Sequence, residues 1–343
     1  MIAFLFQIPR QSESSPKSLR DRILELDLIG ASILIPAIIC LLLALQWGGS
    51  TYAWNNSRII GLFFGFGCLI ILFIFTQIKL GDRATLPPRI LRQRSVAAAS
   101  FFAFLFGAGF FILIFYLPVY FQSVKGVSAT KSGIDVLPLM LATVISSILS
   151  GALITFSGSY APLLISCTAL YSIGAGLLTT YQVDMSFGKW FGYQVLAGAG
   201  LGAGLQIPSI AVQTALLADD VSIGVTCVMF FQTFGGALFV SVGQTVFQNG
   251  LIRGVHEFVP EIDPRVFLLT GATTIRDVLG GLGMLDKLQL VLEAYMVGLK
   301  DAFRVAVACA CAAFLATLCL EWRNVKDEEV KRKNMAMETG SVM

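Results

Sequence analysis

The sequence predicts an all-α integral membrane protein with about eight transmembrane helices. Composition is the first reason: the 343 residues are 56% hydrophobic and only 13% charged. Their mean hydropathy of +0.79 lies well above that of soluble domains. The second reason is length. Residues 96–120 carry no charge, and such a run can cross a hydrocarbon layer of about 30 Å at about 1.5 Å per residue.

The predicted elements begin with a short apolar stretch, Met1–Ile8. It is too short to span a bilayer and lacks the basic start and the cleavage site of a signal peptide. We interpret residues 1–27 as the stub of a preceding helix and a polar cytoplasmic linker. The first two full spans follow at 28–47 and 59–78 and form a transmembrane helix pair, 28–78.

A basic connection, residues 79–95, leads to the rest of the chain. Its five cations are Lys79, Arg83, Arg89, Arg92 and Arg94. The six remaining spans are predicted at 96–120, 134–156, 162–181, 190–216, 221–247 and 302–320. Ser132 and Asp135 have the spacing of a capping box and predict the start of the fourth span. Residues 248–297 are predicted to be a long loop with two short amphipathic helices, and residues 321–343 a charged tail.

Charge distribution predicts the orientation in the membrane. The net charge is only +3, but the cations gather in the linker before the first span, in residues 79–95 and in the tail. Eight spans place both termini on one side of the membrane. The positive-inside rule therefore predicts cytoplasmic termini and an extracellular 248–297 segment.

Residues with catalytic or metal-binding chemistry are scarce. The single histidine, His256, has no cysteine or carboxylate at ligand spacing, and all seven cysteines lie in apolar runs. The run Gly198–Gly204 lacks the spacing and the lysine of a phosphate-binding loop, so we expect it to allow close helix packing. The sequence predicts no metal and no cofactor. A polytopic membrane enzyme would need clustered histidine, aspartate or cysteine at the membrane face, and nucleic-acid binding is disfavoured because the basic residues flank spans.

Uncharged polar and aromatic side chains at membrane depth are the candidate site residues. Gln194, Gln206 and Gln232 must find hydrogen-bond partners in lipid, so they face the bundle interior or a wet cavity. They hold helices together or contact a substrate. Tyr116 and Tyr120, four residues apart, line the wall of such a cavity or anchor the helix at the interface.

Several segments are similar to a known family in order and spacing. They include LDLIGASILIPAIICLLLALQWGGSTYAW, LPPRILRQRSVAAAS, FYLPVYFQSVKGVSATKSGIDVLPLM, GYQVLAGAGLGAGLQIPSIAVQ and FFQTFGGALFVSVGQTVFQN. These segments resemble the 14-span drug:proton antiporters of the major facilitator superfamily, in the fungal efflux-pump branch. The resemblance implies that residues 28–78 are the extra central helix pair of that family and 96–320 its C-terminal six-helix bundle.

The same resemblance leaves the family's N-terminal bundle without a counterpart in this sequence. Met1–Ile8 resembles the end of its sixth helix, and the coupling residues of the missing bundle cannot be carried over. Within the shared half, the resemblance implies that the third and sixth spans line the central cavity. That implication supports Tyr116, Tyr120, Gln194, Gln206 and Gln232 as substrate-cavity candidates.

The expected function is proton-coupled efflux of a small amphipathic compound, such as a drug, toxin or secondary metabolite. Alternating access rocks two bundles about a midplane site, so the chain is expected to need the missing N-terminal bundle or a second copy. The expected partners are the lipid bilayer, a small-molecule substrate and protons. An inactive or regulatory truncated half-transporter is the alternative. The plasma membrane is the expected location and the vacuolar membrane the alternative.

Overall fold

The computed structural model describes residues 27–49, 51–269, 274–322, 324–328 and 330. The interpretation of residues 1–8 as a helix stub, most of the linker and the end of the charged tail lie outside these residues. The helices are α2 (Leu28–Trp47), α3 (Ser57–Leu80), α4 (Pro88–Leu91), α5 (Arg94–Ser123), α6 (Ala129–Asp135), α7 (Leu137–Ser157), α8 (Ala161–Leu178), α9 (Phe187–Ala215), α10 (Ala218–Phe258), α11 (Arg265–Leu269), α12 (Ile275–Gly281) and α13 (Leu288–Thr317), with short 3-10 turns η2 (Gly81–Arg83) and η3 (Leu285–Lys287).

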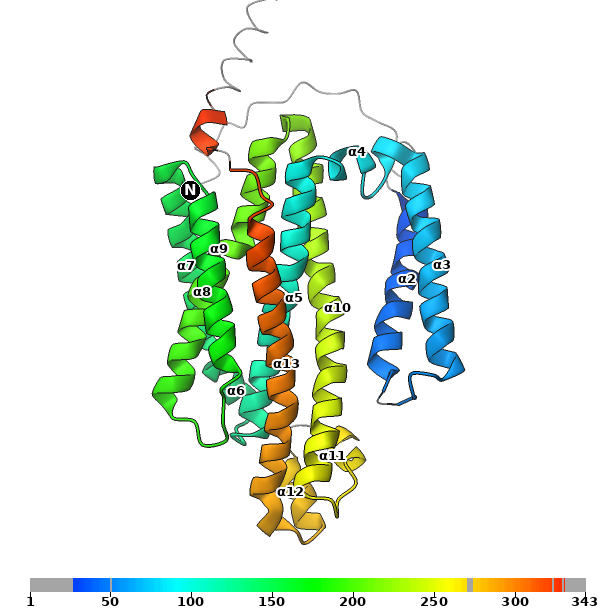
Figure 1. Cartoon of the computed structure of the whole chain (residues 1–343), viewed down its shortest axis with the longest axis vertical. Coiled ribbons are helices and arrows are strands. Elements are labelled where there is room, and N and C mark those ends of the chain that lie inside the picture. The colour runs from blue at the N-terminus through cyan, green and yellow to red at the C-terminus, as the bar shows by residue number, and fades with distance from the viewer. Residues whose placement is uncertain (1–26, 50, 270–273, 323, 329, 331–343) are drawn as a thin grey trace, which may run out of the picture.

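The predicted all-α membrane fold is confirmed. Among the described residues, seven segments are long and apolar enough to cross a membrane: α2, α3 with η2, α5, α6 with α7, α8, α9 and α10. The eighth long helix, α13, has 30 residues and runs beside α5 and α10 (Figure 1). It carries Lys300, Asp301 and Arg304 near its middle, which lowers its hydropathy relative to the others.

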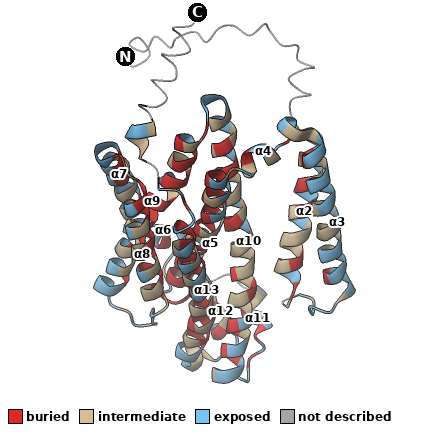
Figure 2. Ribbon diagram, turned by 45° about the horizontal axis from the view of Figure 1, so that its top comes forward, coloured by how far each residue is buried: buried red, intermediate tan, exposed pale blue. Residues whose placement is uncertain are grey.

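The helices form a six-helix bundle with a helix pair at its side. Helices α5, α7, α8, α9, α10 and α13 make the bundle, and α2 with α3 stands beside α10 (Figure 1). Burial is dense along α5, α9 and α13 and sparse along α3 (Figure 2). Phe64 and Ile71 of α3 are 73% and 69% exposed. Large apolar side chains exposed in this way are expected where lipid is the solvent.

Close helix contacts occur at small residues, as predicted for Gly198–Gly204. A Cβ at Gly198 would lie 2.4 Å from the carbonyl oxygen of Leu139 on α7, and one at Gly200 would lie 2.2 Å from the backbone nitrogen of Tyr171 on α8. One at Gly204 would meet the ring of Phe106 on α5 at 2.2 Å. The absence of side chains at these positions therefore lets α9 approach the backbones of α7 and α8 and the Phe106 ring of α5 closely.

Residues 248–297, predicted as a long loop with two short helices, contain more helix than expected. Helix α12 and the start of α13 lie where the two short helices were predicted. Helix α10 continues to Phe258 and α13 already begins at Leu288. The two extensions pack closely, since a Cβ at Gly250 would lie 2.7 Å from the Cα of Gly298, and one at Gly254 would lie 2.8 Å from the Cα of Ala294. Each extension buries its apolar side on the other, so both stay helical although their outer faces are polar.

The predicted start of the fourth span is wrong. Helix α6 begins at Ala129, and Ser128 is its N-cap, accepting the backbone N–H of Lys131 at 3.3 Å. Asp135 instead forms an ion pair with the Lys131 ammonium at 3.0 Å. Both serines precede a run that can form a helix, and the earlier one captures the helix start because residues 129–131 also favour it.

Candidate functional site

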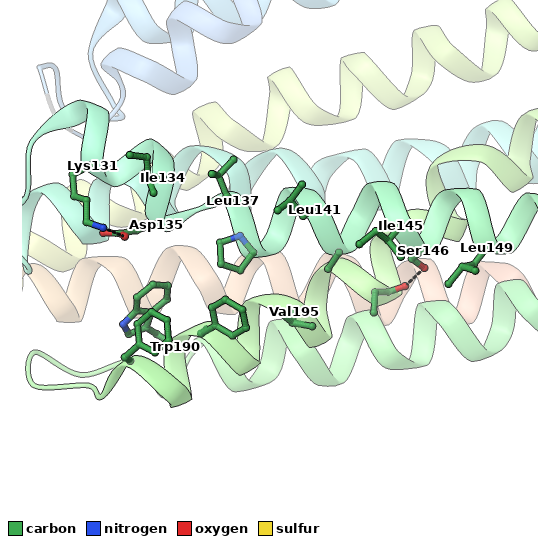
Figure 3. Close-up of a pocket in the computed structure, with 15 residues that line it drawn as sticks. Lys131, Ile134, Asp135, Leu137, Leu141, Ile145, Ser146, Leu149, Trp190 and Val195 are labelled. Carbon is green, nitrogen blue, oxygen red and sulfur yellow. Dashed lines mark hydrogen bonds and ion pairs between the residues drawn. The ribbon is translucent and has the colours of Figure 1, made fainter.

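A long apolar groove lies between the α6–α7 segment and α9. It has a volume of about 650 Å³ and is shown in Figure 3. The lining side chains on one side are Ile134, Leu137, Pro138, Leu141, Ala142, Ile145 and Leu149, and on the other Phe187, Trp190, Phe191, Val195 and Ala199. Lys131, Asp135 and Ser146 contribute charged or hydroxyl groups, and Trp190 contributes an indole N–H. We refer to this feature as the α7–α9 groove.

Small residues on α9 determine the geometry of the groove. A Cβ at Gly202 would lie 2.4 Å from the backbone nitrogen of Ser147, so the two helices touch along this line. The Ser146 hydroxyl donates a hydrogen bond to the carbonyl of Ala199 at 2.5 Å (Figure 3). Helix α7 starts anew at Leu137, with Pro138 in its first turn, where a missing N–H costs nothing. The groove therefore has a floor of backbone contact and walls of large side chains.

One end of the groove is charged and aromatic. The Lys131–Asp135 ion pair lies there, close to Trp190 (Figure 3). The Lys131 side chain is 55% exposed and that of Asp135 12%. The other end, at Leu149, is apolar. An elongated molecule with an apolar body and one polar group matches this distribution. The few polar groups in an apolar pocket determine the orientation of the bound ligand.

The five predicted site residues do not come together. Tyr116, Tyr120 and Gln194 are 2%, 0% and 0% exposed inside the bundle. Gln206 is exposed and Gln232 is half-buried, with its backbone carbonyl against Gly107 of α5. None of the five lines the α7–α9 groove.

Two of the buried candidates have hydrogen-bond partners inside the bundle. The Tyr120 hydroxyl donates to the carbonyl of Gln182 at 2.9 Å. The Gln194 amide donates to the carbonyl of Asp135 at 3.1 Å, which joins α9 to the charged end of the groove. Within the described part of the chain, the Tyr116 hydroxyl and the Gln194 amide oxygen have no partner. Gln194 thus positions the end of α6 and does not itself line the groove.

Sequence reasoning missed the groove residues because they are ordinary apolar side chains. Leu141 and Val195 have the same character whether they face lipid, a neighbouring helix or a groove. The available signal was the pair Lys131 and Asp135, four residues apart at the start of a span. A charged pair at that depth is costly unless it serves structure or ligand binding.

A smaller polar pocket of about 410 Å³ lies between the loop that joins α8 to α9, the end of α10 and the first half of α13. Asp184, Glu293 and Lys300 are among its lining residues. Beside it, the Lys125 ammonium donates to the carbonyls of Val183 at 2.8 Å and Met185 at 3.0 Å. Burial lowers the pKa of Lys125, and the charge of Asp184 partly offsets that effect. These bonds hold the loop between α8 and α9 in place.

A second polar cluster fixes the start of the helix pair. One carboxylate oxygen of Asp27 accepts the backbone N–H of Gly30 at 2.6 Å and caps α2. The other accepts from the Gln77 amide at 2.6 Å and from the backbone and hydroxyl of Thr85 at 3.0 and 2.9 Å. Burial would raise the pKa of Asp27, but these hydrogen bonds together lower it. The cluster thereby ties α2, α3 and the following loop together.

The described residues contain no group of three or more histidine, cysteine, aspartate or glutamate side chains that could hold a metal ion. The cysteines are free and dispersed, and Cys227 and Cys309 are buried.

Three fungal proteins are similar to almost the whole chain. The MFS-type efflux pump MFS1 of Arthroderma benhamiae is 48% identical over 330 residues, which cover 96% of this chain and 61% of that protein. Efflux pump roqT of Penicillium rubens is 43% identical over 325 residues, 95% of this chain and 59% of that protein. Efflux pump aflT of Aspergillus parasiticus is 41% identical over 327 residues, 95% and 63% respectively. The chain therefore spans about 60% of the length of these relatives.

No family model matches the chain. Among solved structures, a bacterial homologue of the human lysosomal transporter Spinster, in an inward-facing and unoccupied conformation, has a similar fold. Its TM-score is 0.51 at 17% sequence identity, and the match covers 87% of this chain and 66% of that one. The match therefore supports the helical architecture alone.

Proposed function

The chain is a homologue of the efflux pumps of the major facilitator superfamily, and on this premise we propose that it takes part in exporting small amphipathic compounds such as drugs, toxins or secondary metabolites. The observation that carries the proposal is the similarity to MFS1, 48% identical over 96% of this chain. Transport is proposed in place of catalysis because the described site offers apolar surface and one ion pair. It holds no arrangement of nucleophile and base.

The lining of the α7–α9 groove favours an amphipathic substrate. Its walls are apolar along most of their length, and Lys131 and Asp135 supply both signs of charge at one end. Either charge could orient a polar group of a solute while the hydrophobic body lies along α7 and α9. Gln194 then acts behind the groove, where its amide donates to the carbonyl of Asp135 and positions the end of α6. Tyr116, Tyr120, Gln206 and Gln232 remain proposed contacts for a solute that enters deeper.

A second helical bundle is part of the proposal. Alternating access requires two bundles that move about a common site, and MFS1 has sequence beyond the 61% that this chain matches. We assign the coupling proton to that second bundle. Asp135, Asp220 and Asp301 are each already engaged in an ion pair, with Lys131, Arg89 and Arg253 respectively.

Orientation and location follow from charge. The connection between α3 and α5 contains five of the cations, so we propose that this end of the molecule and both termini face the cytoplasm. The closely packed extensions of α10 and α13 then lie outside. The plasma membrane is the proposed location, because export from the cell requires it.

Efflux measurements test the proposal. The chain is expressed in a pump-deficient fungal strain, alone and together with the remaining N-terminal part of MFS1, and retention of a fluorescent amphipathic dye is measured at matched membrane abundance. We expect efflux with the added bundle and none from the chain alone. Val195→Trp fills the groove and should lower efflux several-fold. The control is Leu153→Trp. Leu153 lies on α7, is 52% exposed and does not line the groove.

Two results would contradict the proposal. Absence of efflux in both arrangements, with correctly inserted protein, would argue against a transport role. Equal efflux by the two tryptophan variants would remove the groove from the transport path while leaving the role itself in place.

A further inference from the structure

A second apolar groove separates the α2–α3 pair from the bundle. Its volume is about 460 Å³. The helix pair contributes Leu34, Ile38 and Ile70, and α10 contributes Phe230 and Phe234. At the other end of the pair, the Thr245 hydroxyl of α10 donates to the carbonyl of Leu45 at 2.7 Å. The pair is thus held to α10 at that end while a groove remains beside its other half.

A neighbouring slot of about 410 Å³ lies between α5 and α10. Ala97, Ser100 and Phe104 line it from α5. Leu91 and Phe231 line both this slot and the groove beside the helix pair, so the two meet at these residues. Ser100 is 3% exposed, and its hydroxyl has no hydrogen-bond partner among the described residues. A buried hydroxyl in this state is costly unless a ligand accepts its proton.

The Arg92 side chain lies near the place where the groove beside the helix pair meets the α5–α10 slot. Arg92 lines the groove and is exposed, in the turn between α4 and α5. Its neighbour Arg89 makes a two-bond pair with Asp220 at 2.9 and 2.7 Å and a further bond to Asp82 at 3.0 Å. Within the part of the chain that the structure describes, Arg92 has no such carboxylate partner. Its charge is available to a ligand.

We propose that the groove beside the helix pair and the α5–α10 slot together bind one anionic diacyl phospholipid. The phosphate lies on the Arg92 guanidinium, and one acyl chain enters each slot on either side of Leu91 and Phe231. The Ser100 hydroxyl, in the second turn of α5, donates to an ester carbonyl of the lipid. The proposal uses the orientation given above in one respect, because anionic lipids are concentrated in the cytoplasmic leaflet.

The lipid would also complete the packing between the helix pair and the bundle. The apolar walls of the groove do not touch each other, so their side chains lack the dispersion contacts of a packed interface. An acyl chain in the groove supplies those contacts. The charge at the mouth selects an anionic headgroup over a zwitterionic one. The lipid therefore acts as a structural ligand that sets how firmly α2 and α3 rest on α10.

Native mass spectrometry of the purified full chain, in equal amounts of phosphatidylserine and phosphatidylcholine, tests the proposal. We expect one phosphatidylserine to be retained in preference to phosphatidylcholine. Arg92→Gln should lower that preference by up to about fivefold, since a single exposed ion pair between a guanidinium and a phosphate contributes at most about that factor. Arg94→Gln is the matched control: it removes the same charge two residues away, and Arg94 lines neither slot. The control should retain the preference.

A second measurement guards against an unstable variant. Phosphatidylserine should raise the melting temperature of the wild-type chain more than phosphatidylcholine does, and Ala97→Trp, which fills the α5–α10 slot, should abolish the difference. Equal lipid preference in Arg92→Gln and Arg94→Gln, or retention of both lipids alike by the wild type, would overturn the proposal. Because the readout is binding, its failure is independent of the efflux result.

Discussion

The close approach of α5 and α10 at Gly107 leads to a quantitative prediction. A Cβ at Gly107 would lie 2.2 Å from the carbonyl oxygen of Gln232 and 3.0 Å from its carbonyl carbon, whereas ordinary contacts begin at 3.4 Å. The contact is with backbone, so no side chain can rotate away. Gly107→Ala must therefore push the two helices apart by about 1 Å, and such overpacking costs about 1–3 kcal/mol.

Gly151→Ala on α7 is the matched control, because nothing lies within 4 Å of its added Cβ. Alanine is the better helix former by about 1 kcal/mol at both positions, so that effect cancels in the comparison. We expect Gly107→Ala to be less stable than Gly151→Ala by about 1–3 kcal/mol. Equilibrium unfolding in mixed micelles measures the difference. Equal stability of the two variants would refute the backbone contact between α5 and α10.

Two further predictions concern polar side chains. Asp27→Asn replaces the carboxylate oxygen that accepts three of the hydrogen bonds by an amide nitrogen, which cannot accept them. The substitution should lower the free energy of unfolding by about 1–2 kcal/mol at neutral pH. Because the pKa of Asp27 is lowered in the folded protein from 3.8, its contribution is complete above that value and is lost as the pH falls through the folded-state pKa. The stability difference between wild type and variant should therefore shrink in acid, and a difference that persists would contradict the assignment. Tyr120→Phe should cost about 1 kcal/mol, while Tyr116→Phe, whose hydroxyl has no partner among the described residues, should be neutral or stabilising. Equal losses in the two variants, measured by the same unfolding assay, would show that the Tyr120 hydrogen bond contributes nothing.

The sequence predicted helices well and their ends less well. The first span, 28–47, agrees with α2 at both ends, because apolar length and flanking polar residues define it. The prediction erred at Ser132 because two serines compete to cap the same helix. It also placed a loop where α10 continues to Phe258, and a separate short helix where α13 already begins. These outer halves are too polar to be recognised as parts of spans and are held helical by contacts with each other.

Candidate site residues were harder to predict than helices. Glutamine and tyrosine stand out in an apolar sequence, and the structure does place Gln194 and Tyr120 at buried hydrogen bonds. The α7–α9 groove, in contrast, is lined by residues such as Leu141 and Val195. Nothing in their identity distinguishes them from lipid-facing neighbours.

The sequence by itself determined that this chain lies in a membrane, and the cation count supports one orientation. Transfer of apolar side chains out of water is roughly additive along the chain, so composition and length suffice for that conclusion. Only the tertiary structure decided which faces of the helices meet. In lipid, no hydrophobic force favours one apolar face over another, so shape at positions such as Gly107 and Gly202, together with a few hydrogen bonds, selects the contacts.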